Sequence, residues 1–134
     1  MSFYDELADE YKADVDPETG LSGSNRKTLD LIICRLKNNI RESFRKGILH
    51  TVVHYDNFLR DSPALIHHTL ECVEICEVLS GCLYDEKYAK AHRLLRESIG
   101  TEFNIYIDHV SKGMYSDKFT IKITWEAPEI EETT

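Results

Sequence analysis

Two runs near the C-terminal end of the chain alternate between apolar and polar residues, the pattern of a strand with one buried face. The apolar positions are Phe103, Ile105 and Ile107 in the first run and Phe119, Ile121, Ile123 and Trp125 in the second. Lys112 and Gly113 lie between the runs and supply turn chemistry. The sequence therefore predicts a β-hairpin with an inner face that other elements must cover, and with Trp125 on that face.

Upstream of the hairpin, apolar residues recur at helical spacings of three and four. A first helix is predicted to begin at Ser2, where Asp5 completes a capping box, and to end before the turn at 16–20. The clearest pattern predicts a helix over 25–46. Its expected core face consists of Leu29, Ile32, Ile33, Leu36, Ile40 and Phe44. Glycines mark the expected ends of two further helices, over 63–80 and 85–99.

Residues between Ile48 and Phe58 are rich in β-branched and aromatic types, which predicts a strand over 49–56. Three strands and four helices give an α+β fold, in which a three-stranded antiparallel sheet carries amphipathic helices on one face. We divide the chain into an acidic helix and linker (1–22), a single domain (23–126) and an acidic tail (127–134).

The composition, with 42% hydrophobic and 30% charged residues among 134, is that of a globular protein. No apolar run approaches the roughly 18 residues that span a bilayer, and the N-terminus lacks the basic start of a signal peptide. We expect a cytoplasmic protein with no membrane contact, no cofactor and free cysteine thiols.

The net charge of −8 is unevenly distributed along the chain. Residues 1–22 carry −6 and residues 126–134 carry −4, whereas residues 23–125 carry +2. Acidic ends therefore flank a nearly neutral body.

Three stretches of the chain carry a family resemblance: Arg41 to His54, Leu94 to Ile107, and Phe119 to Trp125. Their helix, strand, further helix and hairpin ending in Ile-x-Trp resemble small uncharacterised accessory proteins of Gram-positive phages and prophages. The acidic first helix and the Cys-rich third helix depart from that pattern. The resemblance brings no catalytic motif, and it implies a phage-borne protein that binds and blocks a host protein in the host cytoplasm.

His68, Cys72 and Cys76 fall at i, i+4 and i+8 of the predicted third helix and are weak candidates for metal ligands. Zinc modules use closer cysteine pairs, so we interpret these cysteines as core residues. A small metal-dependent or Cys/His enzyme remains an alternative function, although no catalytic signature accompanies the cluster.

Lys37, Arg41 and Arg45 form a basic stripe on the second helix, at a spacing that suits contact with phosphates. A nucleic-acid-binding module is therefore a second alternative, although the low isoelectric point near 5.2 argues against it. The stripe is also a surface on which the chain's own acidic helix could dock.

Acidic residues of the first helix and a hairpin surface are the predicted protein-binding residues. They are Asp5, Glu6, Asp9, Glu10, Tyr106, Met114 and Tyr115. An anionic surface competes for a basic nucleic-acid channel, so the sequence favours a non-enzymatic inhibitor of a host or defence enzyme, with a homodimer left open. Deletion of residues 1–20 is expected to weaken binding and leave the fold intact.

Overall fold

The sheet of this protein has three antiparallel strands: β1 (His50–Phe58), β2 (Asn104–Ser111) and β3 (Ser116–Thr124). The computed structural model describes residues 2–58, 66–111 and 116–128, with the backbone alone described for 56–58, 66–72 and 116–117. The strand order is β1-β3-β2, which makes the last strand the central one. The predicted α+β class with a three-stranded antiparallel sheet is confirmed.

The two faces of the sheet differ in burial, as the alternation predicts. On the inner face, the register places Ile121 of β3 between Val53 and Ile107, and Ile121 is fully buried. On the outer face, Lys122 lies between Val52 and Tyr106, and all three side chains are exposed. One face of the sheet therefore joins the core and the other meets solvent.

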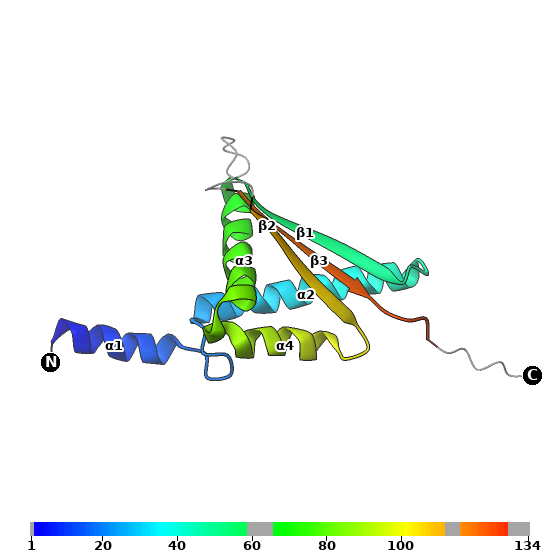
Figure 1. Cartoon of the computed structure of the whole chain (residues 1–134). Helices are drawn as coiled ribbons and strands as arrows, with labels where there is room; N and C mark the ends of the chain where they lie inside the picture. The colour runs from blue at the N-terminus through cyan, green and yellow to red at the C-terminus, as the bar shows by residue number, and fades with distance from the viewer. Residues whose placement is uncertain (1, 59–65, 112–115, 129–134) are drawn as a thin grey trace, which may run out of the picture.

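The helices are α1 (Phe3–Asp14), α2 (Gly23–Arg45), α3 (Ile66–Tyr84) and α4 (Ala89–Ile99), with a short 3₁₀ turn η2 (Glu86–Tyr88) before α4. α2, α3 and α4 pack together around the inner face of the sheet, whereas α1 extends away from this body (Figure 1). The centre of the core consists of Leu29, Ile32, Leu36, Ile75, Leu79, Leu95, Phe119, Ile121 and Ile123. Among the described residues, no helix is long and apolar enough to cross a membrane.

Three helices differ from the prediction at their boundaries. α2 covers Gly23–Arg45 where 25–46 was predicted. Gly81 does not end the third helix, which continues to Tyr84. A side chain at Gly81 would lie 2.7 Å from the ring of Tyr88, so this glycine makes room for a neighbouring aromatic residue. The predicted start of that helix at 63 lies outside the described residues. The fourth helix begins with η2, where the Asp85 side chain accepts a hydrogen bond from the backbone N–H of Lys87.

Phe44 was expected in the core but is 47% exposed. It lies in the last turn of α2, where its ring stacks on Trp125 with centroids 5.9 Å apart. Trp125 itself is 7% exposed, as the alternation predicted. Phe44 therefore lies at the edge of the core, covered by Trp125 on one side.

Candidate protein-binding helix

The segment between α1 and α2 is an ordered loop, although its composition suggested a linker. Val15 and Ser22 form an isolated antiparallel bridge across it. Thr19 and Leu21 within the loop are almost fully buried. The hydroxyl of Thr19 donates to Asp16 Oδ2 at 2.6 Å and accepts from the N–H of Leu21 at 3.2 Å. The base of α1 is therefore fixed to the body of the protein.

Arg26, in the first turns of α2, connects the loop to that helix. Its Nη1 lies 3.0 Å from Asp16 Oδ2 and 3.0 Å from Glu18 Oε2, and its Nε lies 3.1 Å from Asp30 Oδ1. The hydrogen bond from Thr19, with a further one from Arg26, lowers the pKa of Asp16. One guanidinium thus holds three carboxylates in place where α1 meets α2.

α1 is a well-capped helix. The Ser2 hydroxyl accepts from the N–H of Asp5 at 3.2 Å, and the Asp5 carboxylate accepts from the N–H of Ser2 at 3.4 Å. The predicted capping box is therefore present. At the other end, the N–H of Val15 donates to the carbonyl of Tyr11 at 3.1 Å.

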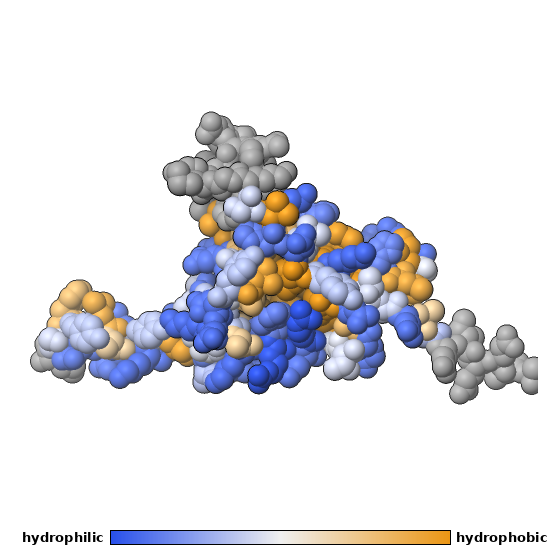
Figure 2. Space-filling view, viewed as in Figure 1, coloured by the Kyte–Doolittle hydropathy of each residue, from blue (hydrophilic) through white to orange (hydrophobic). Residues whose placement is uncertain are grey.

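The apolar stripe of α1 has no cover. Not one residue of α1 is buried. Phe3 is 74% exposed, Leu7 46% and Tyr11 59%, and Tyr4 beside them is 77% exposed. These residues occupy one arc of the helix. The opposite side carries Asp5, Glu6 and Asp9, and Glu10 lies beside Phe3 at the edge of the stripe; all four acidic residues are exposed. Figure 2 shows apolar surface on α1, well away from the rest of the molecule.

A short helix of this kind is marginally stable in water unless its apolar face packs against something. A wide apolar stripe backed by charged residues is how an amphipathic helix binds in a groove of another protein. The fixed loop presents this stripe at a defined place, so α1 is the candidate binding element of the described chain.

Tyr106, another predicted binding residue, lies on the hairpin, away from α1 in the fold. Tyr106 is 59% exposed on the outer face of β2. Exposed Val52 and Val110 share this face. Met114 and Tyr115 lie outside the described residues. The hairpin surface and the acidic helix are therefore two separate candidate surfaces.

The basic stripe does not hold α1. Arg41 and Arg45 are exposed and Lys37 is half-buried, in the C-terminal half of α2. α1 leaves the opposite end of α2 and points away from it (Figure 1). Arg41 instead donates from Nη1 to Asn38 Oδ1 at 3.0 Å. The stripe stays available as an alternative contact for phosphates.

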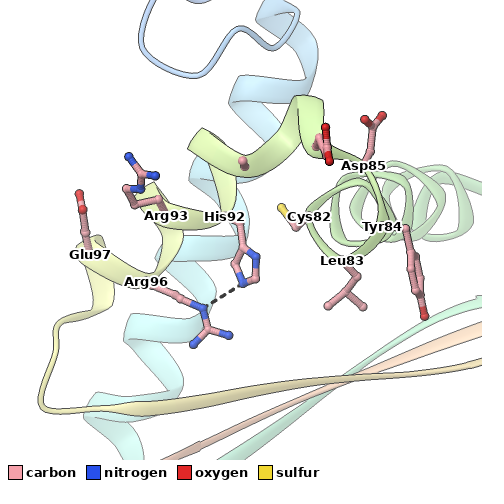
Figure 3. A pocket seen from close by; sticks show the side chains of 10 residues that line it. Cys82, Leu83, Tyr84, Asp85, His92, Arg93, Arg96 and Glu97 are labelled. Carbon is pink, nitrogen blue, oxygen red and sulfur yellow. Dashed lines mark hydrogen bonds between the residues drawn. The ribbon is translucent and has the colours of Figure 1, made fainter.

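A hollow of about 520 Å³ lies between the end of α3 and α4, and Figure 3 shows Cys82 and His92 side by side in it. Burial raises the pKa of the Cys82 thiol to about 11, so the thiol is protonated at neutral pH. His92 accepts a hydrogen bond at Nε2 from Arg96 Nε at 2.9 Å. Burial first, and then the charge of Arg96, lowers the pKa of His92. This environment does not activate a nucleophile.

Of the three predicted metal candidates, the structure describes the side chain of Cys76 alone. Cys76 is buried at 3% exposure, and the side chains of His68 and Cys72 lie outside the described residues. No group of three metal-ligating side chains occurs in the described part of the chain. Cys34 is an exposed free thiol and Cys82 a buried one.

Sequence reasoning missed an aromatic cavity of about 540 Å³ at the far end of α2. Phe44, Phe103 and Trp125 line it together with Glu102, Asn104, Glu126 and Pro128. The ring of Phe103 meets Trp125 edge-on, with centroids 5.6 Å apart and planes at 65°. The cavity joins the ends of α2, β2 and β3, and the aromatic residues in the expected strand pattern were the only available signal for it.

The chain was compared with protein-family models, with curated proteins and with solved structures, and none of them matches it.

Proposed function

We propose that this chain is a non-enzymatic accessory protein of the phage type, which binds a protein partner through α1 and inhibits a host or defence enzyme. The observation that carries the proposal is the uncovered stripe of Phe3, Tyr4, Leu7 and Tyr11 on a helix with a fixed base. An exposed apolar stripe along one side of a helix is what an amphipathic helix uses to bind in a groove of another protein.

The charge of α1 indicates the chemistry of the partner. α1 contains five acidic residues and a single lysine, Lys12, which gives the helix a net charge of −4. An apolar groove with a basic rim, such as a channel that holds nucleic acid, matches both the stripe and the charge. An inhibitor with this surface competes with nucleic acid for the same channel.

The stripe variant tests the proposal. F3A/L7A/Y11A removes three exposed side chains, and alanine preserves the helix because it has the highest helix propensity. Affinity capture from lysate of a Gram-positive host should retain a protein on the wild type and lose it on the variant. Higher salt should also weaken capture, because the screening length at physiological ionic strength is only ~8 Å. The retained protein should release its nucleic acid when the wild-type chain is added.

A matched control separates α1 from the hairpin surface. V52A/Y106A/V110A removes an equal number of exposed apolar side chains from the outer face of the sheet. It should retain the same protein as the wild type. Loss of capture in the sheet variant alone would assign binding to the hairpin, and equal capture by all three chains would refute the proposal.

A further inference from the structure

We infer that the aromatic cavity at the C-terminal end of α2 is a binding site for an arginine side chain of a protein partner. Its walls are the rings of Phe44, Phe103 and Trp125, and its rim carries the carboxylates of Glu102 and Glu126. Aromatic faces attract cations, and carboxylates pair with them. This inference does not depend on α1, which lies at the other end of α2 (Figure 1).

The two rim carboxylates are free to bind a ligand. Both side chains are exposed, and neither forms an ion pair or hydrogen bond with any residue that the structure describes. The Glu102 carboxylate lies over Gly100, where Oε2 would be 2.9 Å from an added Cβ and the Phe103 ring 3.5 Å from it. The exposed Glu102 carboxylate therefore lies near the Phe103 ring.

The surroundings of the cavity also favour a cation. Within the described chain, the lining contains no lysine, arginine or histidine. The nearby Lys46 is paired with Glu42 at 3.2 Å. Two like charges at the rim would repel the acidic α1 of a second copy, so that helix is excluded as the occupant.

Guanidinium fits this cavity better than a quaternary ammonium group does. It is planar and stacks on aromatic rings, and its five N–H donors match the carboxylates. Asn104 at the rim offers a further acceptor in its amide oxygen. A quaternary ammonium has no N–H donor and would leave these acceptors unused.

The protein contains a single tryptophan, and it lines the cavity. Its fluorescence therefore reports directly on occupancy. The probe is N-acetyl-arginine methylamide, and the matched neutral ligand is N-acetyl-citrulline methylamide, which has nearly the same shape without the charge. We expect a saturable change in Trp125 emission with the arginine ligand and at least about tenfold weaker binding of the citrulline ligand.

Two variants localise the effect. E102Q/E126Q should weaken binding of the arginine ligand by at least about tenfold. F44L should weaken it several-fold, because it removes one ring at a half-exposed position. E74Q/E77Q changes the net charge equally at exposed positions of α3 and should leave the affinity unchanged within about twofold. Thermal melts establish that each variant is folded.

Three results would overturn the inference. The first is emission that shows no saturable change with the arginine ligand. The second is equal affinity for the citrulline ligand, which would make the cavity a neutral apolar groove. The third is that E74Q/E77Q weakens binding of the arginine ligand as much as E102Q/E126Q does, which would mean that only the net charge of the protein matters.

Discussion

α1 and α2 are consecutive helices that both carry an apolar stripe, but only α2 buries its stripe. Leu29, Ile32 and Leu36 of α2 are 0% exposed, whereas Phe3 and Tyr11 of α1 are 74% and 59% exposed. The difference lies in what each helix meets. α2 runs beside α3, α4 and β1, and α1 leaves the body at a fixed loop. Amphipathic spacing therefore predicts a helix, and the surrounding chain decides whether that helix stabilises the fold or remains available for binding.

The largest expected difference is in the free energy of unfolding, when a leucine in the apolar stripe of α2 or of α1 is replaced by alanine. Leu36→Ala removes a fully buried side chain and should lower the free energy of unfolding by about 2–5 kcal/mol. Leu7→Ala removes a side chain that is 46% exposed and should change it by less than about 0.5 kcal/mol. Urea unfolding of both variants measures the two values. A loss above about 2 kcal/mol for Leu7→Ala would mean that α1 packs against the body.

The next effect concerns the loop that joins the two helices. Thr19→Val keeps the shape of a buried side chain but removes the hydroxyl that joins Asp16 to Leu21. The variant should lose about 1–3 kcal/mol, since the N–H of Leu21 then lacks this partner. Ser24→Ala, at an exposed position nearby, is the control and should be nearly neutral. A neutral Thr19→Val would show that the loop is not an anchor.

In and around the loop, the sequence predicted the features that depend on neighbouring residues and missed those that depend on contacts with another element. The capping box at Ser2 and the end of α1 follow from neighbouring residues, and both were predicted. Thr19 donates to the carboxylate of Asp16, and Arg26 of the next helix pairs with the same carboxylate. The position of Thr19 therefore depends on a residue of another element. Asp, Pro, Thr and Gly indicate a turn but do not indicate its burial. A deletion of residues 1–20 would therefore remove the buried Thr19 along with α1.

In the rest of the fold, too, local sequence patterns were predictive and contacts between separate elements were not. Alternation predicted the hairpin and the burial of Trp125, because a strand with one covered face has a period of two. The aromatic cavity was not predictable, since it depends on where the end of α2 meets the start of β2. Gly81 was misread for a related reason: the ring that fills its space belongs to Tyr88, in a separate element.

The smallest expected effect is a pH dependence in the body of the protein. The pKa of His92 is lowered from its ordinary value of 6.5 in the folded chain. The unfolded chain therefore binds this proton more readily, and stability falls as the pH drops through about 6.5. The melting temperature of the wild type should decrease more between pH 7.5 and 5.5 than that of His92→Gln. Equal decreases in the melting temperatures of the wild type and His92→Gln would contradict the assignment of this pH dependence to His92.

The central claim is that α1 is held outside the core and contributes nothing to its stability. The direct test is urea unfolding of a chain that begins at Asp14, which lacks α1 but keeps the anchored loop. Its free energy of unfolding should match that of the full chain within about 0.5 kcal/mol, because no residue of α1 is buried. A loss of more than about 2 kcal/mol would contradict the account and make α1 part of the fold.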